Sequence, residues 1–300
     1  MKWRKAKDDT PKPDGFLTRL RRRITDHNSS MFAASVAFFA FVALVPALVA
    51  TISITSLVTD SDELVDQARD ALDSSPAETR DFLVDQIESI AGSSTDAGIA
   101  AAVGVALAIF SASGAVGNLM TALNVVFERR ESRNFVMKRL IAIGFLVGAV
   151  VVIAAVVFAM GVLPEYVDDW IPSTAGRVGV EVARFLVPLV VMAFGLSWLY
   201  RSGPAPVETT TYELVPGGKK PFLTVGSVAA TALFLLLTWG FGFFARNFGS
   251  YNETYGTLAG IIMLLLLLQL AALAVLIGAE VDAIRKEMRI ERSRSEAGLG

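Results

Sequence analysis

The sequence predicts an all-α, polytopic membrane protein, built as a bundle of six transmembrane helices with an outward-facing helical hairpin loop. Hydrophobic residues make up 53% of the 300 positions and charged residues only 19%, whereas a soluble domain carries about 25% charged residues. The apolar residues come in long uncharged runs instead of recurring at amphipathic spacing. Such runs indicate membrane spans, because about 20 residues of helix cross the hydrocarbon core.

Six uncharged stretches are long enough to span a bilayer. Each is expected to be a helix, because the bilayer core offers no water to satisfy the backbone polar groups. The fourth stretch is the least uniform, since Glu181 and Arg184 lie where it begins, but its apolar segment from Phe185 to Tyr200 is continuous. The predicted spans cover residues 29–58, 97–127, 140–163, 182–200, 221–245 and 254–279.

The distribution of charge orients these spans. When the connecting segments are assigned to alternate sides of the membrane, one side holds 22 of the 27 Lys and Arg residues but only 13 of the 29 acidic residues. By the positive-inside rule that side is cytoplasmic. The prediction is therefore a multi-pass protein of the cytoplasmic (inner) membrane with both termini in the cytoplasm, which requires an even number of spans.

The predicted membrane domain, residues 29–281, lies between two cytoplasmic tails, residues 1–28 and 282–300. In the first tail, Phe16, Leu20 and Ile24 share one helical face beside a run of arginines. This pattern predicts a short interfacial helix on an anionic leaflet. The alternative for the arginines is ordinary flanking charge that only sets the orientation of the first span.

The longest loop, residues 60–96, faces outward and is strongly acidic. Two stripes of apolar residues at helical spacing flank a Ser-Ser-Pro break that ends at Pro76. Because proline suits the first turn of a helix, we expect a helical hairpin here.

The residue types present exclude several kinds of site. The chain has no Cys and a single His, His27. This excludes a disulfide framework, an iron–sulfur centre, a thiol nucleophile and a zinc site with several His or Cys ligands. No paired carboxylates and no nucleophile–base pair fall within the predicted spans. We therefore expect no enzyme activity, no catalytic residues, no metal and no cofactor.

Polar residues and helix-breaking prolines inside a span are candidate functional positions, because they are costly in a bilayer. Ser111 and Asn118 share one angular sector of the second span, and Gln269 lies among leucines near the centre of the sixth. The predicted pathway or ligand-binding residues are Ser35, Pro46, Ser111, Asn118, Arg184, Tyr255, Gln269 and Glu280.

Each of these positions also has a structural interpretation. The polar sector of the second span is typical of helix–helix packing. Arg184 follows Glu181 at i, i+3 spacing, which suits an ion pair that extends outward to the interface. Glu280 lies at the inner end of the sixth span, where an interfacial residue is ordinary. Two G-x-x-x-G pairs, Gly144 with Gly148 and Gly256 with Gly260, predict close helix packing and permit a homo-oligomer.

Several strings in the chain resemble one family. The segment AASVAFF at 33–39 leading to Pro46 resembles the first span of the YihY/BrkB family of bacterial inner-membrane proteins. Further matching strings are SASGAVG at 111–117, LYR at 199–201, FGSYNETYG at 248–256 and LIGAE at 276–280. The resemblance covers roughly residues 16–284 and implies a six-helix inner-membrane protein. The chain departs from the family at Leu267-Leu268-Gln269, where relatives usually carry an aromatic pair.

The family has carried the label ribonuclease BN, and the sequence argues against that activity. Metal-dependent RNA hydrolysis needs clustered His and Asp ligands, whereas this chain has one His. We expect membrane lipid as a partner, a small solute or a lipid as substrate, and no nucleic acid. The leading hypothesis is a transporter or a lipid- or solute-handling protein. The alternative is a non-catalytic envelope scaffold or assembly factor, and a membrane-embedded enzyme ranks third.

Overall fold

The structure is a computed structural model that describes residues 15–55, 66, 97–170, 174–206, 222–247 and 257–296. Within these ranges the regular elements are α-helices, which confirms the predicted all-α fold class. Their bounds are α1 (Phe16–Asp26), α2 (Ser29–Thr55), α5 (Ala97–Val126), α6 (Phe135–Trp170), α7 (Thr174–Ser202), α8 (Val225–Asn247) and α10 (Thr257–Glu296).

Six of these helices, all except α1, are long and apolar enough by length and composition to cross a membrane. They correspond one to one with the six predicted spans. The predicted outer hairpin at 60–96 lies outside the described residues apart from the exposed Asp66. The helix α10 passes through residues 281 and 282 without a break and has 40 residues. At about 1.5 Å per residue it is about 60 Å long, roughly twice the thickness of a hydrocarbon core.

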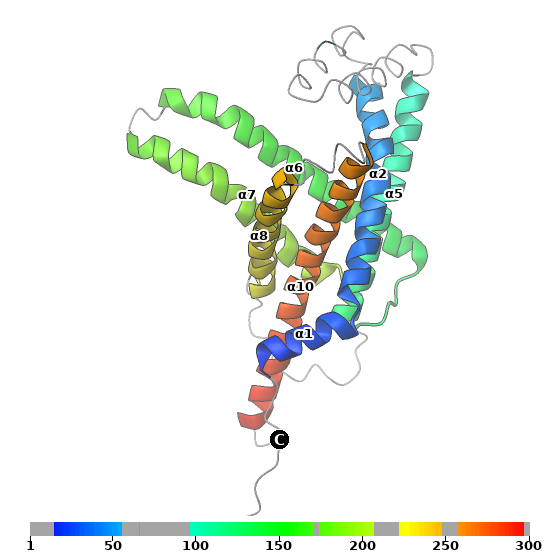
Figure 1. The fold of residues 1–300 in the computed structure, drawn as a ribbon, viewed down its shortest axis with the longest axis vertical. Coiled ribbons are helices and arrows are strands. Elements are labelled where there is room, and N and C mark those ends of the chain that lie inside the picture. The colour runs from blue at the N-terminus through cyan, green and yellow to red at the C-terminus, as the bar shows by residue number, and fades with distance from the viewer. Residues whose placement is uncertain are drawn as a thin grey trace, which may run out of the picture.

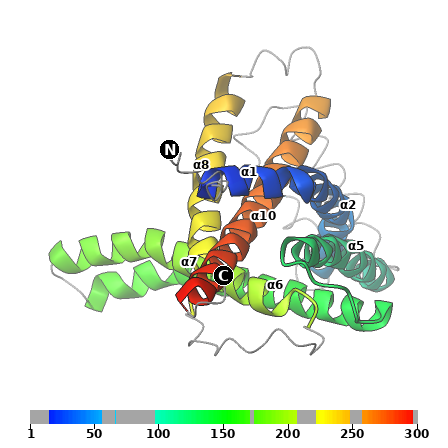
Figure 2. The same ribbon diagram turned by 90° about the horizontal axis from the view of Figure 1, so that it is seen from below.

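The short helix α1 exists where the amphipathic pattern predicted it, and it turns sharply into α2. His27 and Asn28 form the corner, with Asn28 at φ 50°. Asn tolerates this left-handed conformation better than most residues with a side chain. The corner lets α1 lie across α10 at the end of the bundle where α10 continues toward the C-terminus (Figures 1 and 2).

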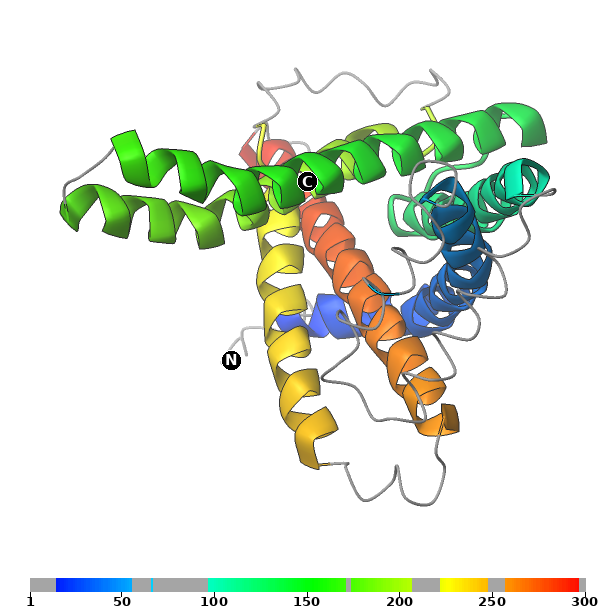
Figure 3. The same cartoon turned by 90° about the horizontal axis from the view of Figure 1, so that it is seen from above.

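The helices α2 and α5 lie side by side (Figures 1 and 3). Small residues allow the contact, because a Cβ added at Gly104 would lie 3.1 Å from the backbone nitrogen of Ala50. Nearer the other end, a Cβ added at Gly114 would lie 3.0 Å from the ring of Phe39. Glycines of this kind let membrane helices approach closely where no hydrophobic effect drives them together.

The helices α8 and α10 cross in close contact at Gly226 and Gly278. A Cβ added at Gly278 would lie 2.5 Å from Cβ of Ala230, 2.5 Å from the carbonyl oxygen of Gly226 and 2.8 Å from the hydroxyl of Tyr200. A Cβ added at Gly226 would in turn collide with the carbonyl oxygen of Gly278. The two backbones are therefore in direct contact, and neither glycine can be enlarged without moving a helix.

The helices α6 and α7 form a hairpin that extends away from the other helices (Figures 1 and 3). The run from Val150 to Ile153 on α6 is exposed on all sides of the helix, which is expected of a segment that faces lipid. Only the beginning of α6 lies close to α5. This arrangement places the first turns of α6 against the side of a neighbouring span.

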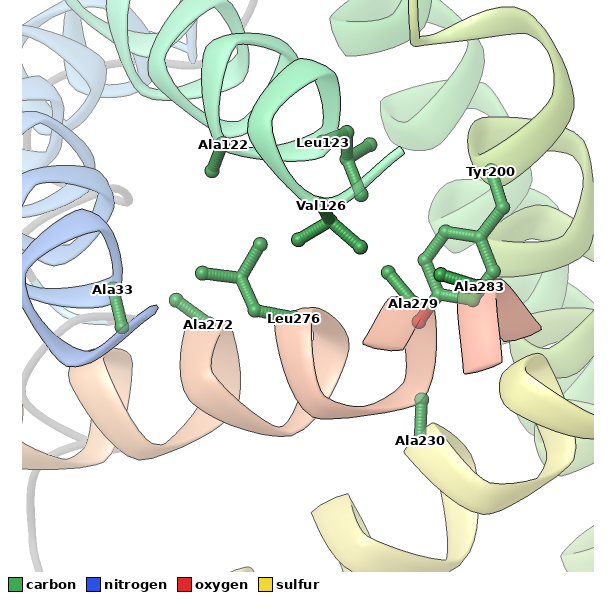
Figure 4. Packing of buried hydrophobic residues seen from close by; sticks show 10 residues of the cluster. All are labelled: Ala33, Ala122, Leu123, Val126, Tyr200, Ala230, Ala272, Leu276, Ala279 and Ala283. Carbon is green, nitrogen blue, oxygen red and sulfur yellow. The ribbon is translucent and has the colours of Figure 1, made fainter. Parts of the chain in front are cut away.

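The buried hydrophobic core lies where α2, α5, α7, α8 and α10 converge (Figure 4). Most of its side chains are small, so the helices pack through close backbone approach and few large side chains. Leu123, Leu276 and Tyr200 are its large members. The full cluster consists of Ala33, Ala122, Leu123, Val126, Tyr200, Ala230, Ala272, Leu276, Ala279 and Ala283.

Candidate functional site

Two cations of α6 lie against the side of α5, and we call Lys138 and Arg139 the α5–α6 cation pair. Nζ of Lys138 donates a hydrogen bond to Oγ1 of Thr121 at 2.6 Å. The guanidinium of Arg139 donates to the carbonyl oxygen of Phe110 and lies 4.3 Å from the centre of the Phe110 ring. Both helices are membrane-span candidates over these residues, 102–126 in α5 and 135–156 in α6. The pair therefore brings positive charge into segments that are otherwise apolar.

This positive charge is only partly balanced. Oε2 of Glu131 lies 3.8 Å from Nζ of Lys138. Among the described residues, no carboxylate lies within ion-pair distance of Arg139, whose two contacts are with a neutral carbonyl and a ring. The first turn of α6 also holds no acidic residue. Because a helix N-terminus carries partial positive charge, the start of α6 is a place where an anion would be stabilised.

The loop from 127 to 134 fixes the start of α6, and a buried asparagine holds this loop against the end of α7. Asn124 accepts a hydrogen bond from the backbone N–H of Ala205 at 2.6 Å and donates to Glu131 at 2.9 Å. Arg129 donates to the Ala205 carbonyl at 2.7 Å, and Arg133 donates to the carbonyl of Gly203 at 3.0 Å.

Glu131 is the acidic centre of this loop. Its carboxylate accepts from Nε of Arg133 at 2.7 Å and from the backbone N–H of Arg133 at 3.2 Å. The hydrogen bond from the Arg133 side chain lowers the pKa of Glu131 to about 2, with further contributions from its backbone N–H, its charge and Asn124, against the effect of burial. Glu131 therefore stays ionised near neutral pH and offsets part of the charge on Lys138.

A second cluster of charges joins α1 to α10. Glu280 is 0% exposed, and its two carboxylate oxygens face Nε of Arg23 at 2.8 Å and Nδ1 of His27 at 2.6 Å. Arg23 also donates to the carbonyl of Val126 at 2.7 Å and pairs with Glu287. One arginine of α1 thus contacts the last residue of α5 and two carboxylates of α10.

Arg23 remains charged in this position. Burial acts to lower its pKa, but the hydrogen bond to Glu280 and the neighbouring carboxylates raise the pKa of Arg23 overall. We call Arg23, His27 and Glu280 the α1–α10 latch. The buried ion pair of Arg23 and Glu280 within it is costly to break, because removal of one member leaves the opposite charge unpaired.

The structure describes six of the eight predicted pathway residues with their side chains. Ser35 and Pro46 are half-buried on α2, and Ser111 and Asn118 are half-buried on α5, which packs beside α2. Gln269 is half-buried and Glu280 fully buried on α10. Arg184 belongs to α7, but its side chain lies outside the described residues, as does the whole of Tyr255.

These residues do not converge on one point. Eleven positions of helix separate Gln269 from Glu280, which is about 16 Å along α10. Glu280 lies with α1 in the latch, whereas Ser111 and Asn118 lie on the length of α5 between Phe110 and Thr121, the residues that the α5–α6 cation pair contacts.

The predicted packing glycines meet few atoms of the described residues. A Cβ added at Gly144 or at Gly260 would meet no atom within 4 Å, and one added at Gly148 would lie 3.7 Å from the ring of Trp198. Gly256 lies outside the described residues. Within the described chain, Gly226 and Gly278 make a tight contact between helices.

Sequence reasoning passed over the residues that make most of the polar contacts. It assigned Lys138 and Arg139 to the positive-inside charge, which explains their side of the membrane but gives them no partner, and it gave Arg23 an anionic leaflet or an orienting role. The signal that distinguishes them is position: Lys138 and Arg139 fall at the start of a long apolar helix, inside the candidate span. Charges inside a span, unlike charges in a loop, indicate function by default.

Comparisons with known proteins place this chain among bacterial membrane proteins. The family model described as virulence factor BrkB matches residues 20–298. A ribonuclease-like protein of Bacillus subtilis, YfkH, is 25% identical over 271 residues, which cover 90% of this chain and 94% of that protein. A UPF0761 membrane protein of Xanthomonas axonopodis pv. citri is 26% identical, over 96% of this chain and 65% of its own length.

A further UPF0761 membrane protein, from Rhodospirillum centenum, is 28% identical over 93% of this chain and 59% of its own length. This chain therefore spans less than two thirds of these two UPF0761 relatives. No solved structure matches the chain.

Proposed function

The chain belongs to the virulence factor BrkB family of membrane proteins, and we propose that it is a transporter or a lipid- or solute-handling protein that acts on an anionic substrate. We propose that the protein lies in the cytoplasmic (inner) membrane, with both termini in the cytoplasm. The asymmetry of Lys and Arg supports that orientation, because 22 of 27 fall on the side of the termini.

The observation that carries the proposal is the position of the α5–α6 cation pair. Arg139 lies in a candidate span with no carboxylate partner among the described residues. Ionisable residues inside a membrane are rare and typically mark a substrate or ion path. Ser111 and Asn118 lie on the same stretch of α5 and can supply neutral hydrogen-bonding groups beside the two cations.

The ribonuclease-like name of the Bacillus protein does not carry over to this chain. An enzyme that hydrolyses RNA with metal ions needs several clustered metal ligands, and the full sequence holds one His and no Cys. The printed names of the UPF0761 relatives describe membrane proteins and name no substrate. The support for an anionic substrate therefore comes from the cations of this chain alone.

A scaffold or assembly factor is the second candidate. The observation that favours it is the extension of α10 beyond the membrane domain, which presents an exposed charged surface. Its exposed basic residues are Arg285, Lys286, Arg289, Arg292 and Arg294. A scaffold would use this surface to bind other proteins and would need no bound small molecule within the spans.

Mass spectrometry of molecules that stay bound to the gently purified protein distinguishes the two candidates. We expect a stoichiometric anionic ligand in the natural chain and its loss in a variant with Arg139→Gln and Asn118→Leu. A matched control, Thr18→Leu, changes a polar residue on α1, away from the spans. Retention of only bulk lipid, equal in all three proteins, would overturn the proposal and favour the scaffold.

A further inference from the structure

We propose that the ligand of the α5–α6 cation pair is an anionic phospholipid, whose phosphate is held by Arg139 and whose acyl chains lie on the apolar surface around it. This inference rests on the proposed function and names its substrate class. It follows from three features of the start of α6: the charge of the pair, the donors that remain on it, and the chemistry of the neighbouring surface.

The charge at this place calls for an anion. Arg139 faces the Phe110 carbonyl and ring but no carboxylate of the described chain. The nearest counter-charge of Lys138, Glu131, lies 3.8 Å away and already accepts hydrogen bonds from Arg133. A cation in a low-dielectric region is stabilised by a paired, hydrogen-bonded anion, which here has to come from outside the described residues.

The geometry of the donors suits a phosphate. A guanidinium carries five N–H donors in a planar fork that matches two oxygens of a phosphate. In Arg139 only one nitrogen, Nη2, donates to the Phe110 carbonyl. Lys138 is adjacent in sequence and adds three donors on a flexible stem, of which one reaches Thr121. Phe110 and Thr121 are eleven positions apart, about 16 Å along α5, so the two cations reach different levels of that helix and the fork of Arg139 is the group that suits the phosphate.

The surface around the pair favours a lipid over a soluble anion. Phe135 is 77% exposed, Phe110 64%, Val136 63% and Leu140 58%. These large side chains surround the first turns of α6 and the facing part of α5. A soluble anion would gain nothing from such a surface, whereas acyl chains would cover it. Basic side chains set between membrane helices are typical of sites for anionic head groups.

The test uses the full chain purified in detergent and titrated, in native mass spectrometry, with phosphatidylglycerol, phosphatidylcholine and inorganic phosphate. We expect one phosphatidylglycerol to bind at least tenfold more tightly than phosphatidylcholine, and inorganic phosphate at millimolar concentration not to displace it. Arg139→Gln should weaken phosphatidylglycerol binding about tenfold, and Lys138→Gln should weaken it less, because its ammonium group bonds Thr121 and lies 3.8 Å from Glu131.

Two further variants keep the test interpretable. Arg130→Gln removes an exposed arginine from the adjacent loop and should leave the affinity unchanged. Arg139→Lys keeps the charge but loses the planar fork, so its affinity should fall between those of the natural chain and Arg139→Gln even if the Gln variant folds poorly.

Equal losses in Arg130→Gln and Arg139→Gln would overturn the inference, because they would show that lipid responds only to total charge. Competition by inorganic phosphate would also overturn it and indicate a soluble anion as the substrate. In that second case the proposed function would survive, since an anion would still be bound at the pair. Absence of any bound anion would overturn both.

Discussion

The carboxylate of Glu280 accepts a hydrogen bond from Nε of Arg23 at 2.8 Å, across 257 positions of sequence. This contact fastens α1 to α10 at the end of the core where Val126 closes α5. Since the Glu280 side chain is fully buried, the pair determines how the N-terminal helix is held against the last span.

Loss of Arg23 should lower the free energy of unfolding strongly. Arg23→Met keeps most of the side-chain volume but leaves the buried Glu280 without its arginine, and removal of one partner of a buried pair costs roughly 3–5 kcal/mol. Arg21→Met alters an exposed arginine of the same helix and should change the free energy of unfolding by less than about 0.5 kcal/mol. Thermal unfolding in detergent measures both, and similar Tm values for the two variants would show that the latch does not stabilise the fold.

The crossing of α8 and α10 should not tolerate a larger residue. In Gly278→Val the new Cβ would lie 2.5 Å from Cβ of Ala230 and 2.5 Å from the Gly226 carbonyl, so the helices must separate, at a cost of about 1–3 kcal/mol. Gly260→Ala on the same helix meets no atom within 4 Å and should gain about 0.5–1 kcal/mol from reduced backbone entropy. The two Tm shifts are therefore expected to have opposite signs, and a Val variant as stable as the natural chain would contradict the close crossing.

These two contacts show what local sequence patterns can predict. The six spans follow from runs of hydrophobic residues, a local property, and the helix at Phe16–Asp26 follows from its own periodicity. The partner of Glu280 is not local, and the pattern around Arg23 predicts an anionic leaflet or a role in membrane orientation, not a carboxylate of the last span. Gly226 with Ala230 and Ala274 with Gly278 do form small-x-x-x-small pairs, but many such pairs occur in apolar helices and only the assembled fold selects which ones meet.

The candidate site was predictable only in part, for the same reason. Ser111 and Asn118 were found because they are polar within an apolar run. Lys138 and Arg139 were not predicted as site residues. Their place beside α5 arises because α6 starts alongside α5 instead of at the end of α5. The residues of the 127–134 loop determine that displacement through contacts with α7, such as Arg133 with the carbonyl of Gly203, which no pattern within the loop reveals.

The end of α5 offers a stabilising substitution. Glu128 has φ 54°, where the N–H of Arg129 bonds the Asn124 carbonyl and its own N–H bonds the Val125 carbonyl, the arrangement in which glycine usually ends a helix. A residue with a Cβ costs about 1–2 kcal/mol in this conformation, whereas the exposed pair between Glu128 and Arg23 is worth at most about 1 kcal/mol.

We therefore expect Glu128→Gly to be more stable than Glu128→Ala by about 1 kcal/mol, because both lose the ion pair and only glycine relieves the strain. Chemical unfolding in mixed micelles gives the difference directly. If the Ala variant were equally stable, the left-handed conformation at this position would carry no cost.

Glu131 should make the stability of the protein depend on pH in a defined range. Its pKa is lowered from 4.5 to about 2 by the hydrogen bond from Arg133, so the folded chain holds this proton less tightly than the unfolded chain. The resulting stabilisation is complete above about pH 4.5 and declines as the pH falls toward about 2.

In Glu131→Gln this contribution is absent at every pH. The Tm difference between the natural chain and Glu131→Gln should therefore be largest at pH 6 and shrink steadily toward pH 2, whereas other carboxylates titrate equally in both proteins and cancel. A difference that stays constant over this range would show that the contacts of Arg133 and Asn124 do not depend on the charge of Glu131.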